Sequence, residues 1–176
     1  MLEHAFSSLA TFVADLDRRT RQDREGNLMR LLGLSGSLSQ GMPHQLPGRE
    51  VLDWAGQEPD VEMDLLEIVT SGIVLCDDRP PERSTGETRR VIDKVVAADT
   101  YVVGSPMYRG SYTGAFKNLF DLLPNDTLTG NVVGLVATGG GDHHFLAPEH
   151  QLRHRQLNAF TCPCRCLGPE QARHLP

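Results

Sequence analysis

Three short segments carry the residues that could do chemistry in this sequence. The first is SGSLS at residues 35–39, whose hydroxyl groups can hydrogen-bond an anion. The second is SPMYRGSYTG at residues 105–114, where two glycines let the backbone approach a flat ligand closely. The third is GGGDHH at residues 139–144, where three consecutive glycines give the same freedom. Together the three segments predict a pocket for a planar, phosphorylated molecule.

Each of these segments follows an apolar run that reads as a strand. The apolar residues run together instead of alternating, as a parallel sheet covered on both faces requires. The predicted strands are residues 28–34, 61–69, 101–104 and 131–138, and the predicted helices are 47–55, 85–98, one that begins after residue 110, and 148–159. The alternation predicts an α/β fold, a flavodoxin-like three-layer αβα sandwich with sheet order 2-1-3-4-5. The fifth strand is left open, because a Cys- and Pro-rich tail stands where its apolar run is expected.

The sequence also predicts how two of these helices begin. The spacing of Ser84 and Glu87 predicts a capping box at the start of the helix over 85–98. Ser111 or Thr113 is expected to cap the following helix. The expected buried side chains are Val91, Ile92, Val95 and Val96 on the first of these helices, and Phe116, Leu119, Phe120 and Leu123 on the second.

Two polar features receive more ordinary interpretations. The long polar segment over 70–87 predicts a mobile or functional flap over the edge of a site. Lys117 and Asp121 stand four residues apart, which favours an exposed ion pair on the helix surface.

Composition narrows the class of protein. The chain has 176 residues and a formal net charge of -6, and its globular part has no basic face, so nucleic acid is not expected as the main ligand. No apolar run approaches membrane-spanning length. Four cysteines without an export signal predict reduced thiols and a cytoplasmic location. The expected organisation is a helical extension over 1–27, one domain over 28–160 and an irregular tail over 161–176.

The predicted topology places the three chemical segments at one edge of the sheet. In the order 2-1-3-4-5 the first and third strands are neighbours, and their helices leave to opposite faces. The crevice at that point holds FMN in flavodoxin-like folds. The first segment would then hold the phosphate beside a helix N-terminus, and the other two would hold the isoalloxazine ring.

Three motifs resemble those of the NAD(P)H-dependent FMN reductases with a flavodoxin-like fold. They are SGSLS at 35–39, SPMYRGSYTGAFKNLFDLLP at 105–124 and ATGGGDHHFLAPEHQLR at 137–153. The resemblance implies FMN as cofactor or substrate, hydride donation from NADPH or NADH, and a homodimer or homotetramer. Some members supply reduced flavin to a flavin-dependent monooxygenase, and others reduce quinone or azo acceptors.

The resemblance also assigns cofactor-binding residues by position. They are Ser35, Ser37, Ser39 and Gln40 on the phosphate loop; Pro106, Met107, Tyr108, Arg109, Gly110 and Ser111 on the ring-binding loop; and Gly139, Gly140, Gly141 and Asp142 on the second ring-contacting loop. No catalytic acid or base is assigned, because the cofactor carries the hydride chemistry. The chain departs from the family at Met42 and Pro43, where a Ser-Arg or Ser-Lys pair is usual.

Three alternatives stay open at the level of sequence. A structural zinc site could use His150 and His154 with the cysteines at 162, 164 and 166, although C-x-C-x-C spacing is unusual for zinc. A flavodoxin-type electron carrier would bind flavin without nicotinamide access. An inactive, truncated family member would also carry the same motifs.

Overall fold

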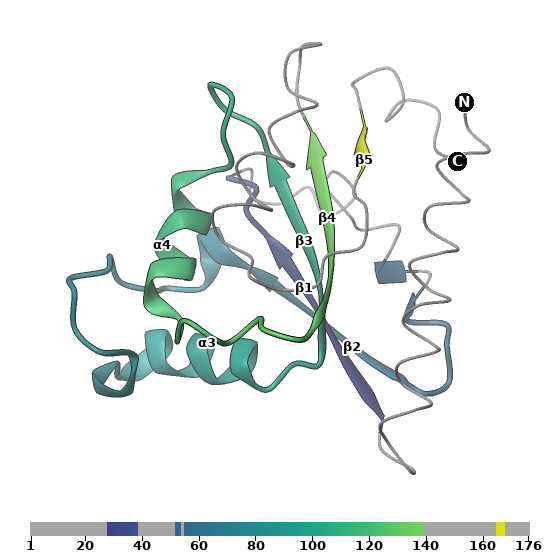
Figure 1. The fold of residues 1–176 in the computed structure, drawn as a ribbon, viewed down its shortest axis with the longest axis horizontal. Coiled ribbons are helices and arrows are strands. Elements are labelled where there is room, and N and C mark those ends of the chain that lie inside the picture. Colours follow the sequence, from purple (N-terminus) through teal and green to yellow (C-terminus); the bar gives the residue numbers. More distant parts are fainter. Residues whose placement is uncertain (1–27, 39–51, 54, 139–164, 168–176) are drawn as a thin grey trace.

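The computed structural model describes residues 28–38, 52–53, 55–138 and 165–167, the last three by their backbone alone (Figure 1). The predicted N-terminal helix, the helix over 148–159 and the segment GGGDHH lie outside these residues, as do most of the helix over 47–55 and of the tail. Their predictions therefore stay predictions.

The described strands form one parallel sheet, as the sequence predicts. The strands are β1 (Met29–Ser35), β2 (Val61–Glu67), β3 (Thr100–Pro106) and β4 (Val132–Thr138), in the order β2-β1-β3-β4. Three residues of the tail, β5 (Arg165–Leu167), pair with β4 in parallel. The order 2-1-3-4 is thus confirmed, and Figure 1 shows the twist that these parallel strands share.

Burial explains why the apolar runs became strands. All the residues of β1 except Arg30 are buried, and β3 is buried from Thr100 to Ser105, because apolar side chains pack against both faces of the sheet there. β2 lies at the edge; its first five residues alternate between partly buried and exposed positions, and Leu66 is buried. It ends at Glu67, two residues before the predicted boundary, where a 3-10 helix, Ile68–Thr70, takes over.

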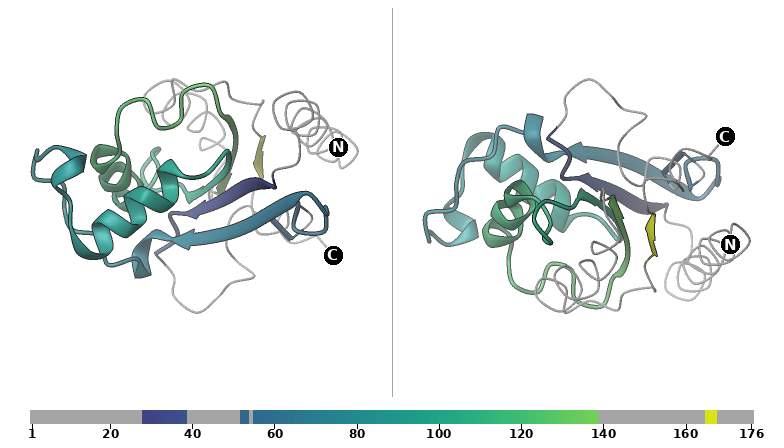
Figure 2. Two further views of the ribbon diagram at one scale, coloured as in Figure 1. Left: turned by 90° about the horizontal axis from the view of Figure 1, so that it is seen from below. Right: turned by 90° about the horizontal axis from the view of Figure 1, so that it is seen from above.

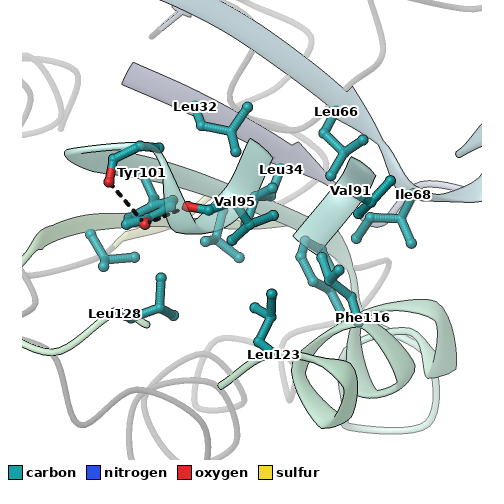
Figure 3. Close-up of a cluster of buried hydrophobic side chains, with 14 of the residues drawn as sticks. Leu32, Leu34, Leu66, Ile68, Val91, Val95, Tyr101, Phe116, Leu123 and Leu128 are labelled. Atoms are coloured by element: carbon teal, nitrogen blue, oxygen red, sulfur yellow. Dashed lines mark hydrogen bonds between the residues drawn. The ribbon is translucent and has the colours of Figure 1, made fainter. Parts of the chain in front are cut away.

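Two helices, α3 (Gly86–Val96) and α4 (Gly114–Leu122), cover one face of the sheet (Figure 2). Side chains from both helices join β1 and β3 in the larger apolar cluster, which Figure 3 shows around Leu34, Val95 and Phe116. A smaller cluster on the opposite face contains Leu52 and Ala55 from the helical segment after β1. The connection after β1 therefore uses one face of the sheet and α3 and α4 use the other, as the three-layer prediction requires.

The start and the outer edge of α3 differ from their predictions. The predicted capping box is wrong: Thr85 is the N-cap, without a side-chain cap bond, because Ser84 already ends the preceding 3-10 turn. Glu87 instead pairs with Arg90 on the helix surface. The predicted buried residues Val91, Ile92 and Val95 are buried, but Val96 is 50% exposed, since it lies beyond the stripe that faces the sheet.

Tyr101 joins β3 to the end of α3. Its ring is fully buried, and its hydroxyl donates to the backbone carbonyls of Val95 at 2.8 Å and Ala98 at 3.1 Å (Figure 3). These carbonyls lie at and just after the C-terminus of α3, where a helix leaves acceptors unfilled, and the Val95 carbonyl also accepts from the N–H of Ala98 at 3.2 Å. Burial raises the pKa of Tyr101 to about 12. The hydroxyl therefore stays protonated and acts as a helix cap from a neighbouring strand.

The connection between β2 and α3 is fastened to the helices. The side-chain amide of Asn118 on α4 accepts from the N–H of Cys76 at 2.8 Å and donates to the carbonyl of Val74 at 2.9 Å. The hydroxyl of Thr88 on α3 accepts from the N–H of Val74 at 3.0 Å. The structure thus fastens this segment to two helices at Val74 and Cys76, and the mobile or functional flap over the edge of a site stays a prediction. None of the helices in the described part of the chain has the length and apolar character of a membrane span.

Candidate functional site

The carboxyl ends of β1 and β3 meet where the chain leaves the sheet in opposite directions. Ser35 lies opposite Gly104 in the register, and the N–H of Gly36 donates to the carbonyl of Gly104 at 2.9 Å. The chain after β1 packs Leu52 on one face, whereas α4 covers the other. This is a topological switch point, the place where open parallel sheets form a ligand-binding crevice.

The loop after β1 is shaped by its first serine. Ser35 is 1% exposed, and its hydroxyl accepts from the N–H of Ser37 at 3.4 Å. Such a bond turns the backbone sharply just beyond the strand. Ser37 itself is partly exposed above this turn, whereas Ser39 and Gln40 lie outside the described residues. Of the predicted phosphate-loop residues, Ser35 thus shapes the loop and Ser37 is placed toward the surface.

Gly36 allows α4 to approach the loop. A β-carbon at this position would lie 2.1 and 2.3 Å from two ring carbons of Phe116, and 2.9 Å from the hydroxyl oxygen of Thr113. Phe116 is fully buried and cannot move aside. The absence of a side chain at Gly36 is therefore what brings the N-terminus of α4 against the first loop. Sequence reasoning missed this role, because it depends on a contact between residues 80 positions apart.

The connection from β3 to α4 is anchored at both ends. Ser105 and Pro106, which the sequence analysis placed in the loop, belong to β3. The buried hydroxyl of Ser105 accepts from the N–H of Thr113 at 3.3 Å and donates to the carbonyl of Pro106 at 2.9 Å. Met107 is 4% exposed, and its N–H donates to the carbonyl of Thr138 at the end of β4, at 2.7 Å. The loop therefore spans the ends of two strands and a helix.

The tip of this connection is a tight reverse turn. The N–H of Tyr108 donates to the carbonyl of Ser111 at 2.8 Å, and the N–H of Ser111 donates to the carbonyl of Tyr108 at 3.1 Å. Arg109 and Gly110 between them have φ of 55° and 77°. Positive φ at both central residues is the pattern of a type I′ turn. Glycine adopts it freely, but at Arg109 the left-handed backbone costs about 1 kcal/mol or more.

Thr113 begins α4, as one of the two predicted caps, but its side chain makes no cap bond. Its hydroxyl oxygen is buried and has no hydrogen-bond partner. Since it lies beside Gly36, this unsatisfied oxygen marks the junction between the first loop and the N-terminus of α4. A buried polar atom without a partner calls for an explanation, and a bound molecule or water is a common one.

The described residues include no candidate metal site. No group of three His, Cys, Asp or Glu side chains within them could bind a metal ion. The histidines of the zinc hypothesis, Cys162 and Cys164 lie outside this part of the chain, as do Gly139, Gly140, Gly141 and Asp142, and Cys166 is described by its backbone alone. The predicted exposed pair of Lys117 and Asp121 is present on α4.

A parallel sheet of this order, with the connection after β1 on one face and α3 and α4 on the other, defines a flavodoxin-like α/β protein. The apo crystal structure of the NADH:FMN oxidoreductase EMOB has the same fold, with a TM-score of 0.64 and 23% sequence identity over 80% of this chain and 75% of that one.

Sequence comparison narrows this class to one family. The family described as NADPH-dependent FMN reductase matches residues 29–164. An NAD(P)H-dependent FAD/FMN reductase of Geobacillus thermodenitrificans is 38% identical over 125 residues, which cover 71% of this chain and 68% of the relative. An FMN reductase (NADPH) of Pseudomonas aeruginosa is 37% identical over 98 residues, 56% of this chain and 53% of that relative. The chain belongs to the NADPH-dependent FMN reductase family.

Proposed function

We propose that this chain reduces FMN with NADPH or NADH at the carboxyl edge of the sheet. Family membership supports the activity, and the junction of β1, β3 and α4 supports its location. The single observation that carries the placement is the contact of Gly36 with α4, which brings two ligand-binding loops together at the switch point.

The described residues fit FMN in their chemistry. The first loop offers the hydroxyl of Ser37 above a sharp turn, and α4 begins beside it with an unsatisfied hydroxyl at Thr113. The turn at Tyr108–Ser111 offers a flat backbone segment and a half-exposed tyrosine ring, which can lie against a planar ligand. Bound FMN would supply the ring that accepts a hydride from the nicotinamide.

The chain's own residues would then bind and orient. Ser37, with Ser39 and Gln40, would hold the phosphate, and Met107 would fix the ring-binding loop against β4. The remaining ring contacts are assigned to Pro106, Tyr108, Gly110 and Ser111 and to residues 139–142, while Arg109, on the same turn, is assigned to the ring or to the nicotinamide nucleotide. No side chain is assigned to proton transfer.

The proposal extends to the assembly of the protein, its location and the fate of the reduced flavin. Exposed apolar side chains at Val74 and Leu75 favour a homodimer or homotetramer, since solvent-facing residues of this size often meet a partner. The free thiol of Cys76 favours a cytoplasmic location. Supply of reduced flavin to a monooxygenase would follow if the product leaves the site.

The test is nicotinamide oxidation by purified protein, with and without added FMN, in air and without oxygen. Oxidation of NADPH or NADH that requires FMN is the expected result. Saturable flavin binding without any nicotinamide oxidation would contradict the reductase and favour an electron carrier.

A further inference from the structure

The backbone at Arg109 strongly restricts the direction in which this side chain leaves the chain. It occupies the first central position of the turn closed by Tyr108 and Ser111, with φ of 55°. That turn is itself held by Met107, whose N–H bonds to the end of β4. Figure 1 shows this connection standing at the carboxyl end of β3. The guanidinium is therefore carried on a rigid support at the rim of the crevice.

Within the described residues Arg109 has no acidic partner, which sets it apart from most of the other cations there. The other cations of the described residues form ion pairs: Arg30 with Asp99, Arg79 with Asp77, Arg89 with Asp93, Arg90 with Glu87, Lys94 with Asp64, and Lys117 with Asp121. Among the arginines and lysines whose side chains the structure describes, only Arg83 shares the unpaired, exposed state of Arg109. Arg83 lies on the 3-10 turn before α3, well apart from the connection between β3 and α4 (Figure 1).

The positive φ of Arg109 and its unpaired charge have the same explanation. Asparagine followed by glycine is the preferred pair for such a turn, so a less strained sequence was open to this position. Strain at a functional site persists when the side chain has a task there. A guanidinium presents a planar fork of donors that matches a phosphate group in two parallel bonds. The reaction brings one strongly anionic molecule to the rim of the flavin crevice, the nicotinamide dinucleotide.

We propose that Arg109 binds a phosphate of the nicotinamide nucleotide that donates the hydride. The inference rests on the proposed function, because it takes the crevice as the flavin site. The phosphate could be the pyrophosphate, which NADH and NADPH share, or the 2′-phosphate, which NADPH alone carries. A contact of the guanidinium with the flavin ring is the competing arrangement.

The test compares Arg109→Asn with Arg83→Asn in the full chain. Asparagine tolerates positive φ better than arginine, so Arg109→Asn keeps the turn and removes only the cation, and its melting temperature should equal or exceed that of the wild type. Arg83→Asn removes the other unpaired cation and serves as the matched control. Arg109→Lys keeps the charge but loses the two-pronged geometry, and should give an intermediate effect.

Two readouts are needed. Calorimetric titration of the FMN-loaded protein with NADP⁺ and with NAD⁺ measures nucleotide binding without turnover, and steady-state oxidation of NADPH and NADH gives KM and kcat. Arg109→Asn should weaken NADP⁺ binding and raise the KM for NADPH about tenfold, with kcat largely kept and Arg83→Asn unchanged. An equal effect on NAD⁺ and NADH assigns the contact to the pyrophosphate, and an effect on the NADP forms alone assigns it to the 2′-phosphate.

Two results would overturn the inference: unchanged nucleotide binding in Arg109→Asn, or a loss confined to FMN affinity, which would place the guanidinium on the flavin. Failure of the proposed function is a separate outcome. In that case the wild type would bind NADP⁺ but oxidise neither NADPH nor NADH in the presence of FMN.

Discussion

The two ends of β3 use buried hydroxyl groups in opposite ways. At the amino end, the hydroxyl of Tyr101 donates to two carbonyls and completes the C-terminus of α3. At the carboxyl end, the hydroxyl of Thr113 is buried without a partner, and Arg109 holds a left-handed backbone. The hydroxyl at the amino end thus stabilises the fold, whereas Thr113 and Arg109 at the carboxyl end carry polar groups that a ligand can bind. Stability and flavin binding should therefore respond separately to changes at the two ends.

Gly36→Ala should give the largest effect, because it changes both properties at the carboxyl end. The new β-carbon would lie 2.1 Å from the ring of the buried Phe116, so the ring or the first loop must shift. We expect a loss of about 1–3 kcal/mol in the free energy of unfolding, measured with urea, together with weaker FMN binding.

Gly114→Ala is the matched control for that variant. A β-carbon at Gly114 meets nothing within 4 Å, and this first residue of α4 has no positive φ. Its stability should stay the same or rise by up to about 1 kcal/mol. If Gly36→Ala unfolds at the same urea concentration as Gly114→Ala, the close packing of α4 on the first loop is wrong.

Tyr101→Phe should lower stability but leave flavin binding intact, which is the reverse combination. Removing the hydroxyl takes one donor from each of the buried carbonyls of Val95 and Ala98, of which the Val95 carbonyl keeps the N–H of Ala98. We expect a loss of about 1–2 kcal/mol at neutral pH, with the FMN dissociation constant unchanged. A large loss of FMN affinity in this variant would break the separation between the two ends of β3.

The same hydroxyl predicts a stability loss at high pH. Burial raises the pKa of Tyr101 from 10.0 to about 12, so folding favours its neutral form. This contribution is complete below pH 10.0 and is lost as the pH rises through about 12. The difference in unfolding free energy between wild type and Tyr101→Phe should therefore shrink over this interval. A constant difference would show that Tyr101 is not protected from ionisation.

Asn118→Ala should lower stability by less, because it acts where α4 holds the segment after β2. The variant loses two bonds to the segment after β2, one to the Cys76 N–H and one to the Val74 carbonyl, at a cost of about 1 kcal/mol. Alkylation of Cys76, followed in its own peptide by mass spectrometry, should become faster. Lys117→Ala, which loses only the exposed pair with Asp121, should change stability by less than about 0.5 kcal/mol. Equal alkylation rates in the two variants would show that the two hydrogen bonds of Asn118 do not anchor this segment.

The sheet could be predicted from sequence because its strands are short apolar runs. β1, β3 and β4 are buried, and such runs are a local property of the chain. The order 2-1-3-4 followed from the alternation of strands and helices. The errors lie where tertiary contacts decide: Ser84 ends a 3-10 turn and so cannot cap α3, and Val96 falls just outside the buried stripe.

The candidate site was predictable only in outline. The glycines and serines after β1 and β3 mark the right loops, because such residues permit turns and close approach. Their individual roles were not readable. Gly36 accommodates Phe116, Ser105 holds the start of α4, and Asn118 fastens a distant segment. Each role depends on a partner that only the folded chain brings close. The φ of Arg109 likewise follows from the turn that closes around it.

The central claim is that FMN binds at the crevice formed by the loops after β1 and β3. Titration of FMN fluorescence with purified protein tests this most directly, with Ser37→Asp as the variant, since a carboxylate at that loop would repel the flavin phosphate. We predict saturable quenching with the wild type and none with Ser37→Asp, whose urea unfolding should stay close to that of the wild type. Absence of quenching by the wild type, or the same titration curve for both proteins, would contradict the account.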